Sequence, residues 1–173
     1  MAINQSILIQ KAAAFQDSLN ESKRIMASVG TIKSAFLCHS HKDETLVKGL
    51  IAYFKESGID LYIDWKDHSM PETPNGTTAK KIQDAIKARP QFLFLATANS
   101  KASRWCPWEI GYADSSIRKI FIIPTTDGAG TYGNEYLQLY SHIDIGKHEL
   151  RSGLAVFSTR ATHGEWLSGA TFK

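Results

Sequence analysis

The distribution of apolar residues predicts two kinds of structure along this chain, with a change near residue 31. Residues 2–28 carry apolar side chains at helical spacing, which predicts one long amphipathic helix that ends before Gly30. The apolar stripe of this helix consists of Leu8, Ala12, Phe15, Leu19 and Met26. Such a helix could pack against the side of a domain, or it could serve in self-association or in docking a partner.

Beyond residue 31, short apolar runs alternate with amphipathic stretches of helical spacing. Strands are predicted over 34–38, 59–63, 91–96 and 119–124, with a short fifth strand over 142–145. The third of these runs is apolar over its centre, which is typical of a strand covered on both faces in a parallel sheet. Four strand–helix alternations with short connections therefore predict a doubly wound α/β fold.

This pattern divides the chain into three parts. We expect an N-terminal helix over 1–30, an α/β domain over 31–146 and a C-terminal extension over 147–173. The extension contains one more apolar run, 154–157, and the pattern assigns it no role.

Composition narrows the class of protein. The 173 residues are 43% hydrophobic and 21% charged with a net charge of +3, as is ordinary for a folded soluble domain. No basic block favours nucleic acid, and no apolar run approaches the length of a membrane helix. Cys38 and Cys106 form no metal-spaced cluster, so no metal is expected. Two free thiols and the lack of a secretory signal favour the cytoplasm.

Candidate chemistry lies in residues 103–109, which read Ser-Arg-Trp-Cys-Pro-Trp-Glu at the start of a predicted helix. Trp105 and Glu109 are four residues apart and so share one helix face. An aromatic plane beside a carboxylate suits a flat ring and positive charge next to it. Glu109 could instead be a surface carboxylate that the helix dipole favours, and Trp105 could be core packing. Cys106 is expected to be a buried apolar residue, and Trp108 a structural one.

Three segments together resemble one known family. They are 35–40 (Ala-Phe-Leu-Cys-His-Ser) with Asp43 and Glu44 after it, 58–64 (Gly-Ile-Asp-Leu-Tyr-Ile-Asp), and 103–109. In their order and spacing they resemble the TIR domain of Toll and interleukin-1 receptors and resistance proteins, over residues 33–146. The resemblance implies a flavodoxin-like, five-stranded parallel sheet, here with an added N-terminal helix. It also implies a functional loop after the second strand, which the family calls the BB loop.

The resemblance implies an enzymatic activity. Many bacterial and plant TIR domains cleave NAD⁺ at the nicotinamide–ribose bond, and some produce cyclic ADP-ribose isomers that signal in antiphage defence. By this resemblance the chain is expected to be an NAD⁺ glycohydrolase or ADP-ribosyl cyclase, such as the TIR sensor of a Thoeris-like system. Its product would then act on a separate effector. No phosphate-cradling glycine motif follows the first strand, so NAD⁺ is expected as a consumed substrate, without a bound cofactor.

The resemblance also implies roles for particular residues. Glu109 matches the essential glutamate of the family and is the expected catalytic residue. The expected substrate-binding residues are Phe36, His39, Ser40, His41, Trp65, Thr78 and Trp105. Family members commonly assemble, because the BB loop of a neighbour completes the site, so self-association is expected. A Ser/His catalytic pair around Ser40 lacks a nucleophile-elbow pattern and is not favoured.

Two other functions remain open from the sequence. Some TIR domains only bind other TIR domains and perform no chemistry. Nucleoside deoxyribosyltransferases and nucleotide N-glycosidases use a similar sheet and a carboxylate on other substrates. The loop over 64–76 is also longer than is common in the family and contains Pro71 and Pro74, so its conformation is not predicted.

Overall fold

The computed structural model describes residues 2–22, 33–63, 75–117, 119–149, 151–159, 161 and 163–168. Its centre is a seven-stranded sheet in the order β10-β9-β8-β5-β4-β2-β3. Five neighbouring strands are parallel: β3 (Ile59–Tyr62), β2 (Lys33–Cys38), β4 (Phe92–Leu95), β5 (Ile120–Ile123) and β8 (Ser141–His148). This second-first-third-fourth-fifth order is the flavodoxin-like one, which confirms the predicted fold class.

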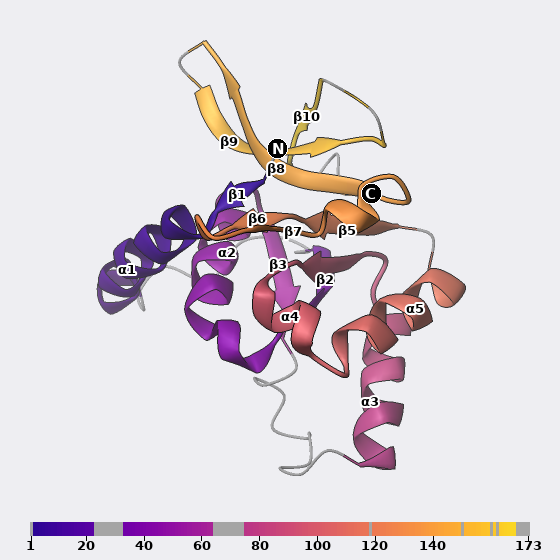
Figure 1. Cartoon of the computed structure of the whole chain (residues 1–173). Coiled ribbons are helices and arrows are strands. Elements are labelled where there is room, and N and C mark those ends of the chain that lie inside the picture. The colour runs from indigo at the N-terminus through magenta and orange to yellow at the C-terminus, as the bar shows by residue number, and fades with distance from the viewer. Residues whose placement is uncertain are drawn as a thin grey trace.

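The sheet extends further than the sequence pattern predicts. Strand β9 (Arg151–Phe157) forms an antiparallel hairpin with β8, and β10 (Glu165–Trp166) pairs antiparallel with β9. In Figure 1 these strands rise above the parallel part of the sheet. The apolar run over 154–157 is thus a strand of the sheet, and β8 itself continues through His148.

The parallel strands are covered on both faces because their side chains alternate. In β2, Ala35 and Leu37 belong to one apolar cluster, whereas Phe36 and Cys38 belong to the other. Helices α1 (Gln5–Ser22) and α2 (Glu44–Glu56) cover the first cluster. Helices α3 (Gly76–Lys87) and α5 (Cys106–Ser116) cover the second, so that the two pairs flank the sheet in Figure 1.

Three short helical segments were not predicted. They are the one-turn 3₁₀ segments His41–Asp43 and Asn134–Tyr136, and α4 (Ala98–Ala102), which follows β4 directly. Thr97 begins α4: its hydroxyl accepts a 2.9 Å hydrogen bond from the amide of Ser100. This cap turns the chain sharply at the carboxyl edge of the sheet. None of the helices in the described ranges is long and apolar enough to cross a membrane.

The N-terminal segment is built into the domain. Strand β1 (Ile3–Asn4) pairs in parallel with β6 (Thr125–Thr126), which also pairs with β7 (Thr131–Tyr132). Residues 125–134, which are rich in Gly and Thr, therefore contain two short strands. Helix α1 follows β1 and is confirmed up to Ser22, while the end predicted near residue 28 lies outside the described residues.

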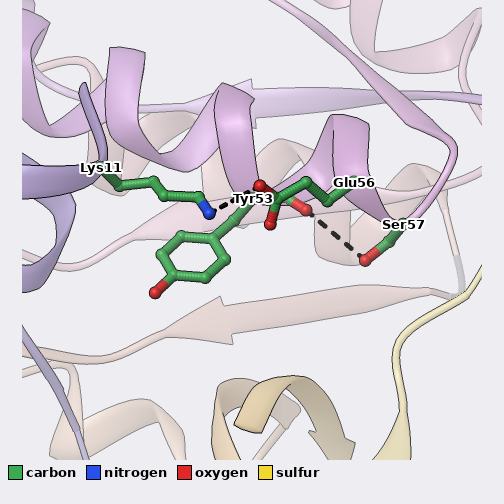
Figure 2. A network of polar contacts seen from close by, with 4 residues as sticks. All are labelled: Lys11, Tyr53, Glu56 and Ser57. Atoms are coloured by element: carbon green, nitrogen blue, oxygen red, sulfur yellow. Dashed lines mark hydrogen bonds and ion pairs between the residues drawn. The ribbon is translucent and has the colours of Figure 1, made fainter. Parts of the chain in front are cut away.

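Helix α1 packs on α2, which supports the first of the two roles considered for it. Leu8 is fully buried, and a Cβ atom at Gly49 would lie 1.9 Å from the Leu8 carbonyl oxygen. Glycine is thus required where the two backbones meet. Figure 2 shows the contact one helix turn further along, where Lys11 Nζ lies 2.6 Å from Glu56 Oε1 and 4.7 Å from the centre of the Tyr53 ring. In the same view the Ser57 hydroxyl donates to the Tyr53 carbonyl.

Candidate active site

The start of α5 is set by the segment that carries the candidate carboxylate. The Ser103 hydroxyl accepts hydrogen bonds from the amides of Trp105 (3.1 Å) and Cys106 (3.3 Å), two groups that a helix start leaves without intrahelical partners. Pro107 stands in the first turn, where its missing N–H costs nothing. The helix therefore begins abruptly and places Glu109 in its first turn.

Glu109 faces the protein interior. Glu109 is only 5% exposed. Its backbone N–H donates a 2.8 Å hydrogen bond to the carbonyl of Trp105. This burial excludes the alternative of a surface carboxylate. The positive end of α5 favours negative charge in this turn. A buried carboxylate near the carboxyl ends of parallel strands is in the position where α/β sheets bind their ligands.

Cys38, the last residue of β2, lies beside Glu109. Its thiol donates a long 3.9 Å hydrogen bond to the Cys106 carbonyl. Burial raises the pKa of the Cys38 thiol well above its ordinary value of 9.0, and interactions with Cys106 and with the charge of Glu109 raise it further. The Cys38 thiol is therefore a neutral group against the carboxylate. Cys106 is buried as well, as predicted for it.

The tryptophans form an aromatic cluster at the helix start. Trp105 is half-buried and packs on the apolar cluster that covers this face of the sheet. Its ring meets Trp108 edge-on, with centroids 5.4 Å apart, and Trp108 stacks on Tyr112 at 6.0 Å. Trp105 thus packs on the core, one of the two roles considered for it, and the stacking of a substrate ring on it stays a prediction.

The loop after β2 brings three candidate residues to the same sheet edge. His39 is buried, and its Nδ1 lies 2.9 Å from the Leu37 carbonyl. Ser40 is also buried, and its hydroxyl accepts a 3.4 Å bond from the Lys42 amide. His41 is exposed, with its ring centre 6.0 Å from that of His39. These residues follow directly on Cys38, the neighbour of Glu109.

Asp43 holds this loop in place. It occupies the N-cap position of α2, but its side chain makes no capping bond. The carboxylate instead accepts hydrogen bonds of 2.6 Å each from the Thr97 hydroxyl and from the side-chain amide of Asn99. These bonds connect the loop after β2 to the start of α4. The segments that follow the neighbouring strands β2 and β4 are therefore held together. Apart from the polar residues that follow β4, no sequence pattern indicates this pairing.

Two further candidates have structural partners. Phe36 is buried and stacks on Tyr62 and Phe92, with centroids 5.7 and 5.5 Å away. Thr78 is buried in a reciprocal cap, where its hydroxyl accepts a 3.0 Å bond from the Asn75 amide. Substrate contact by either residue stays a prediction. Trp65 lies outside the described residues.

A small cavity of about 50 Å³ adjoins the first turn of α5, where Phe94, Thr97, Pro107 and Tyr136 line it. Its volume suits a few water molecules and not a dinucleotide. Within the described residues, no group of three or more His, Cys, Asp or Glu side chains could hold a metal ion.

The fold and the buried glutamate at the strand ends define the class of protein. The family model described as "TIR domain" matches residues 35–155. The chain belongs to the TIR domain family, as the three sequence segments indicate.

Two curated proteins are similar to this chain in sequence. One is "Probable 3' cyclic ADP-D-ribose synthase ThsB'" of Bacillus cereus (strain MSX-D12), which is 32% identical over 120 residues, 66% of this chain and 62% of the relative. The other is "Putative cyclic ADP-D-ribose synthase TIR2" of Cytobacillus dafuensis, which is 28% identical over 101 residues, 57% of this chain and 27% of the relative. The matched stretches thus span less than two thirds of either relative's length.

Proposed function

We propose that this chain cleaves the nicotinamide–ribose bond of NAD⁺ and joins the ribose to the adenosine part, giving a cyclic ADP-ribose. The observation that carries the proposal is the burial of Glu109 at the carboxyl edge of a TIR-domain sheet. The printed names of the two relatives, both cyclic ADP-D-ribose synthases, favour this product.

The proposed chemistry follows from the charges involved. When the bond between the ribose C1′ and the nicotinamide nitrogen breaks, its electron pair neutralises the cationic ring, which leaves as nicotinamide. Positive charge then develops on the ribose, as in glycosidase reactions. The Glu109 carboxylate stabilises this charge most effectively when it is buried, because water does not screen it there. The accessible part of Trp105 supplies a plane for a flat ring of the substrate.

The second half of the reaction decides the product. A nucleophilic atom of the adenosine part attacks C1′ and gives up a proton if it bears one, which closes the cycle. Attack by water instead gives linear ADP-ribose. The cavity of about 50 Å³ beside α5 is too small for NAD⁺, so we propose that self-association, with the BB loop of a neighbouring copy, completes the substrate site.

The proposed biological setting follows from this reaction. A cyclic nucleotide product serves as a diffusible signal, and we propose that a separate effector responds to it in antiviral defence. We place the reaction in the cytoplasm, where buried free thiols such as Cys38 and Cys106 stay reduced.

Product analysis tests the proposal. The purified chain is incubated with NAD⁺ over a range of protein concentrations, and the products are separated and identified by mass spectrometry. The proposal predicts nicotinamide together with a species that has the mass of ADP-ribose less one water. Linear ADP-ribose alone would restrict the activity to hydrolysis. Cleavage of nucleosides or nucleotides in place of NAD⁺ would favour another N-glycosidase, and no cleavage in any assembled state would favour the adaptor role.

A further inference from the structure

The segment after β5 places the ring of Tyr136 beside the candidate active site. The ring packs on Phe94 in β4, with centroids 5.2 Å apart. Phe94 is the register partner of Cys38 in β2, and both side chains belong to the apolar cluster that α5 covers. Since Cys38 lies beside Glu109, Tyr136 belongs to the same group of neighbouring side chains as the carboxylate.

A cavity and the nearby charges also place Tyr136 close to the first turn of α5. Tyr136 and Pro107, which stands two residues before Glu109, line the same small cavity. Burial raises the pKa of the Tyr136 hydroxyl above its ordinary value of 10.0, and nearby charges, including those of the Cys38 and Cys106 thiols, raise it further. Tyr136 therefore carries a neutral phenol close to these two thiols.

The backbone fixes the position of this ring. Gly133 has a φ of 92°, in the left-handed region that favours glycine, and a Cβ atom there would lie 2.6 Å from the Cβ atom of Ala96, directly after β4. The Tyr136 N–H donates a 3.0 Å hydrogen bond to the Gly133 carbonyl, and the Tyr136 carbonyl accepts one of 3.0 Å from the N–H of Tyr140. The turn that carries Tyr136 is therefore seated directly on the strand ends.

The hydroxyl of Tyr136 differs from those of the neighbouring tyrosines. The hydroxyl of Tyr132 donates a 2.8 Å hydrogen bond to Asp127. That of Tyr140 is hydrogen-bonded to Asp114. Tyr136 is half-buried, and its hydroxyl forms no hydrogen bond with the residues that the structure describes. This hydroxyl is not one of the buried polar atoms that lack a partner, so it is accessible to a ligand.

We propose that the Tyr136 hydroxyl forms a hydrogen bond with a hydroxyl of the ribose that Glu109 acts on. This inference rests on the proposed cleavage of NAD⁺ and adds a substrate-binding residue to the site. Glu109 meets that ribose when it stabilises the developing charge, so a group among the same side chains meets the same sugar. A neutral phenol suits a sugar hydroxyl because it both donates and accepts, whereas a phosphate favours arginine and lysine.

The test measures initial rates of nicotinamide release against NAD⁺ concentration, under assembling conditions, for the wild type and for Tyr136→Phe. The variant keeps the ring that packs on Phe94 and lacks only the hydroxyl. Its kcat/KM is expected to be about threefold to tenfold lower, the value of one neutral hydrogen bond, with an unchanged midpoint of urea unfolding. Tyr132→Phe is the matched control and should keep the wild-type kcat/KM, because its hydroxyl is exposed and bonded to Asp127.

Analogues of NAD⁺ identify the group that is bonded. One analogue lacks the 2′-hydroxyl of the nicotinamide ribose, and the other lacks its 3′-hydroxyl. The wild type and Tyr136→Phe are expected to differ on NAD⁺ but to have the same kcat/KM on one of the analogues, because the hydrogen bond is then missing in both proteins. A merely structural role of Tyr136 would lower kcat/KM on all three substrates alike.

The negative results differ in what they overturn. No nicotinamide release by the wild type would contradict the proposed function and, with it, the role of Tyr136. A wild-type kcat/KM in Tyr136→Phe, or a loss that persists with both analogues, would overturn the role of Tyr136 and leave the proposed function standing. A Tyr136→Phe protein that fails to fold would show that the hydroxyl serves the structure, and would overturn that role as well.

Discussion

The carboxylate of Asp43 accepts a 2.6 Å hydrogen bond from the hydroxyl of Thr97, which lies 54 residues further along the chain. The two residues follow neighbouring parallel strands, β2 and β4. Their bond, together with the one from Asn99, joins the loops at the edge of the sheet where Glu109 lies. The candidate site is therefore positioned by a polar connection as well as by apolar packing.

Removing this connection is expected to destabilise the domain. Asp43→Ala leaves the buried Thr97 hydroxyl without its acceptor, so the free energy of unfolding should fall by about 2–3 kcal/mol. The measurement is urea unfolding of Asp43→Ala, Asn99→Ala and the double variant. A coupling energy of about 0.5 kcal/mol or more between the two residues is expected, since they share one network. If the two substitutions change the free energy of unfolding in a strictly additive way, the hydrogen-bonded connection between the two loops is contradicted.

The crossing of α1 and α2 gives a second prediction. Gly49→Ala would place a methyl group against the Leu8 backbone, so the helices must separate, at a cost of about 1–3 kcal/mol of unfolding free energy. Gly111→Ala in α5 is the matched control, because a Cβ atom there meets nothing within 4 Å. It should stabilise the helix by about 0.5–1 kcal/mol. Chemical unfolding measures the free energy of unfolding of both variants. Equal changes in the two variants would refute the close contact between α1 and α2.

The thiols should be unreactive in the folded protein. Cys38 and Cys106 are each about 1% exposed, and the pKa of Cys38 is raised well above 9.0, chiefly by burial. A chromogenic disulfide reagent at pH 8 should therefore label neither thiol at the rate of a free cysteine, and should label both once guanidinium unfolds the chain. Rapid labelling of the native protein would show that the region around Glu109 opens easily.

Asp144 predicts a dependence of stability on pH. Burial raises its pKa in the folded chain above 3.8, so the folded state holds this proton more tightly than the unfolded state. The stabilising contribution of the proton is complete below pH 3.8 and is lost as the pH rises through the folded pKa. Burial lowers the pKa of nearby His142 below 6.5, and the charge of Asp144 opposes this shift, so Asp144→Asn is expected to lower the pKa of His142 further.

The comparison is between the wild-type chain and Asp144→Asn, unfolded in urea from pH 3 to pH 8. The asparagine variant should gain stability relative to the wild type as the pH rises from about 4, because it carries no charge to bury. A difference between the two proteins that does not change with pH would contradict the raised pKa.

Long apolar runs and helical spacing were sufficient to predict the five parallel strands and helices α2, α3 and α5. Very short strands, and contacts between residues far apart in the sequence, produce no such pattern. Strand β1 has only two residues, Ile3 and Asn4, and its partner β6 is a two-residue stretch in a segment that reads as a loop. Asp43 precedes a helix and so predicts a cap, whereas its actual partners are 54 and 56 residues away.

The candidate site was predicted in part. The spacing of Trp105 and Glu109 indicates their shared helix face, but only the packing of β2 against α5 places Cys38 beside the carboxylate. Asp144 alternates with apolar residues in β8, which is typical of a strand with one solvated face. Its burial results from the β9–β10 addition, which the sequence did not indicate.

We propose that the Glu109 carboxylate is essential for the cleavage of NAD⁺. The most direct measurement is the rate of nicotinamide release from NAD⁺, under assembling conditions, by the wild-type chain, by Glu109→Gln and by Glu165→Gln, an exposed carboxylate remote from the site. Release is expected from the wild type and from Glu165→Gln, and a loss of about a hundredfold or more in Glu109→Gln, as when a group that stabilises transition-state charge is removed. Release by Glu109→Gln at the wild-type rate, or none by the wild type, would contradict it.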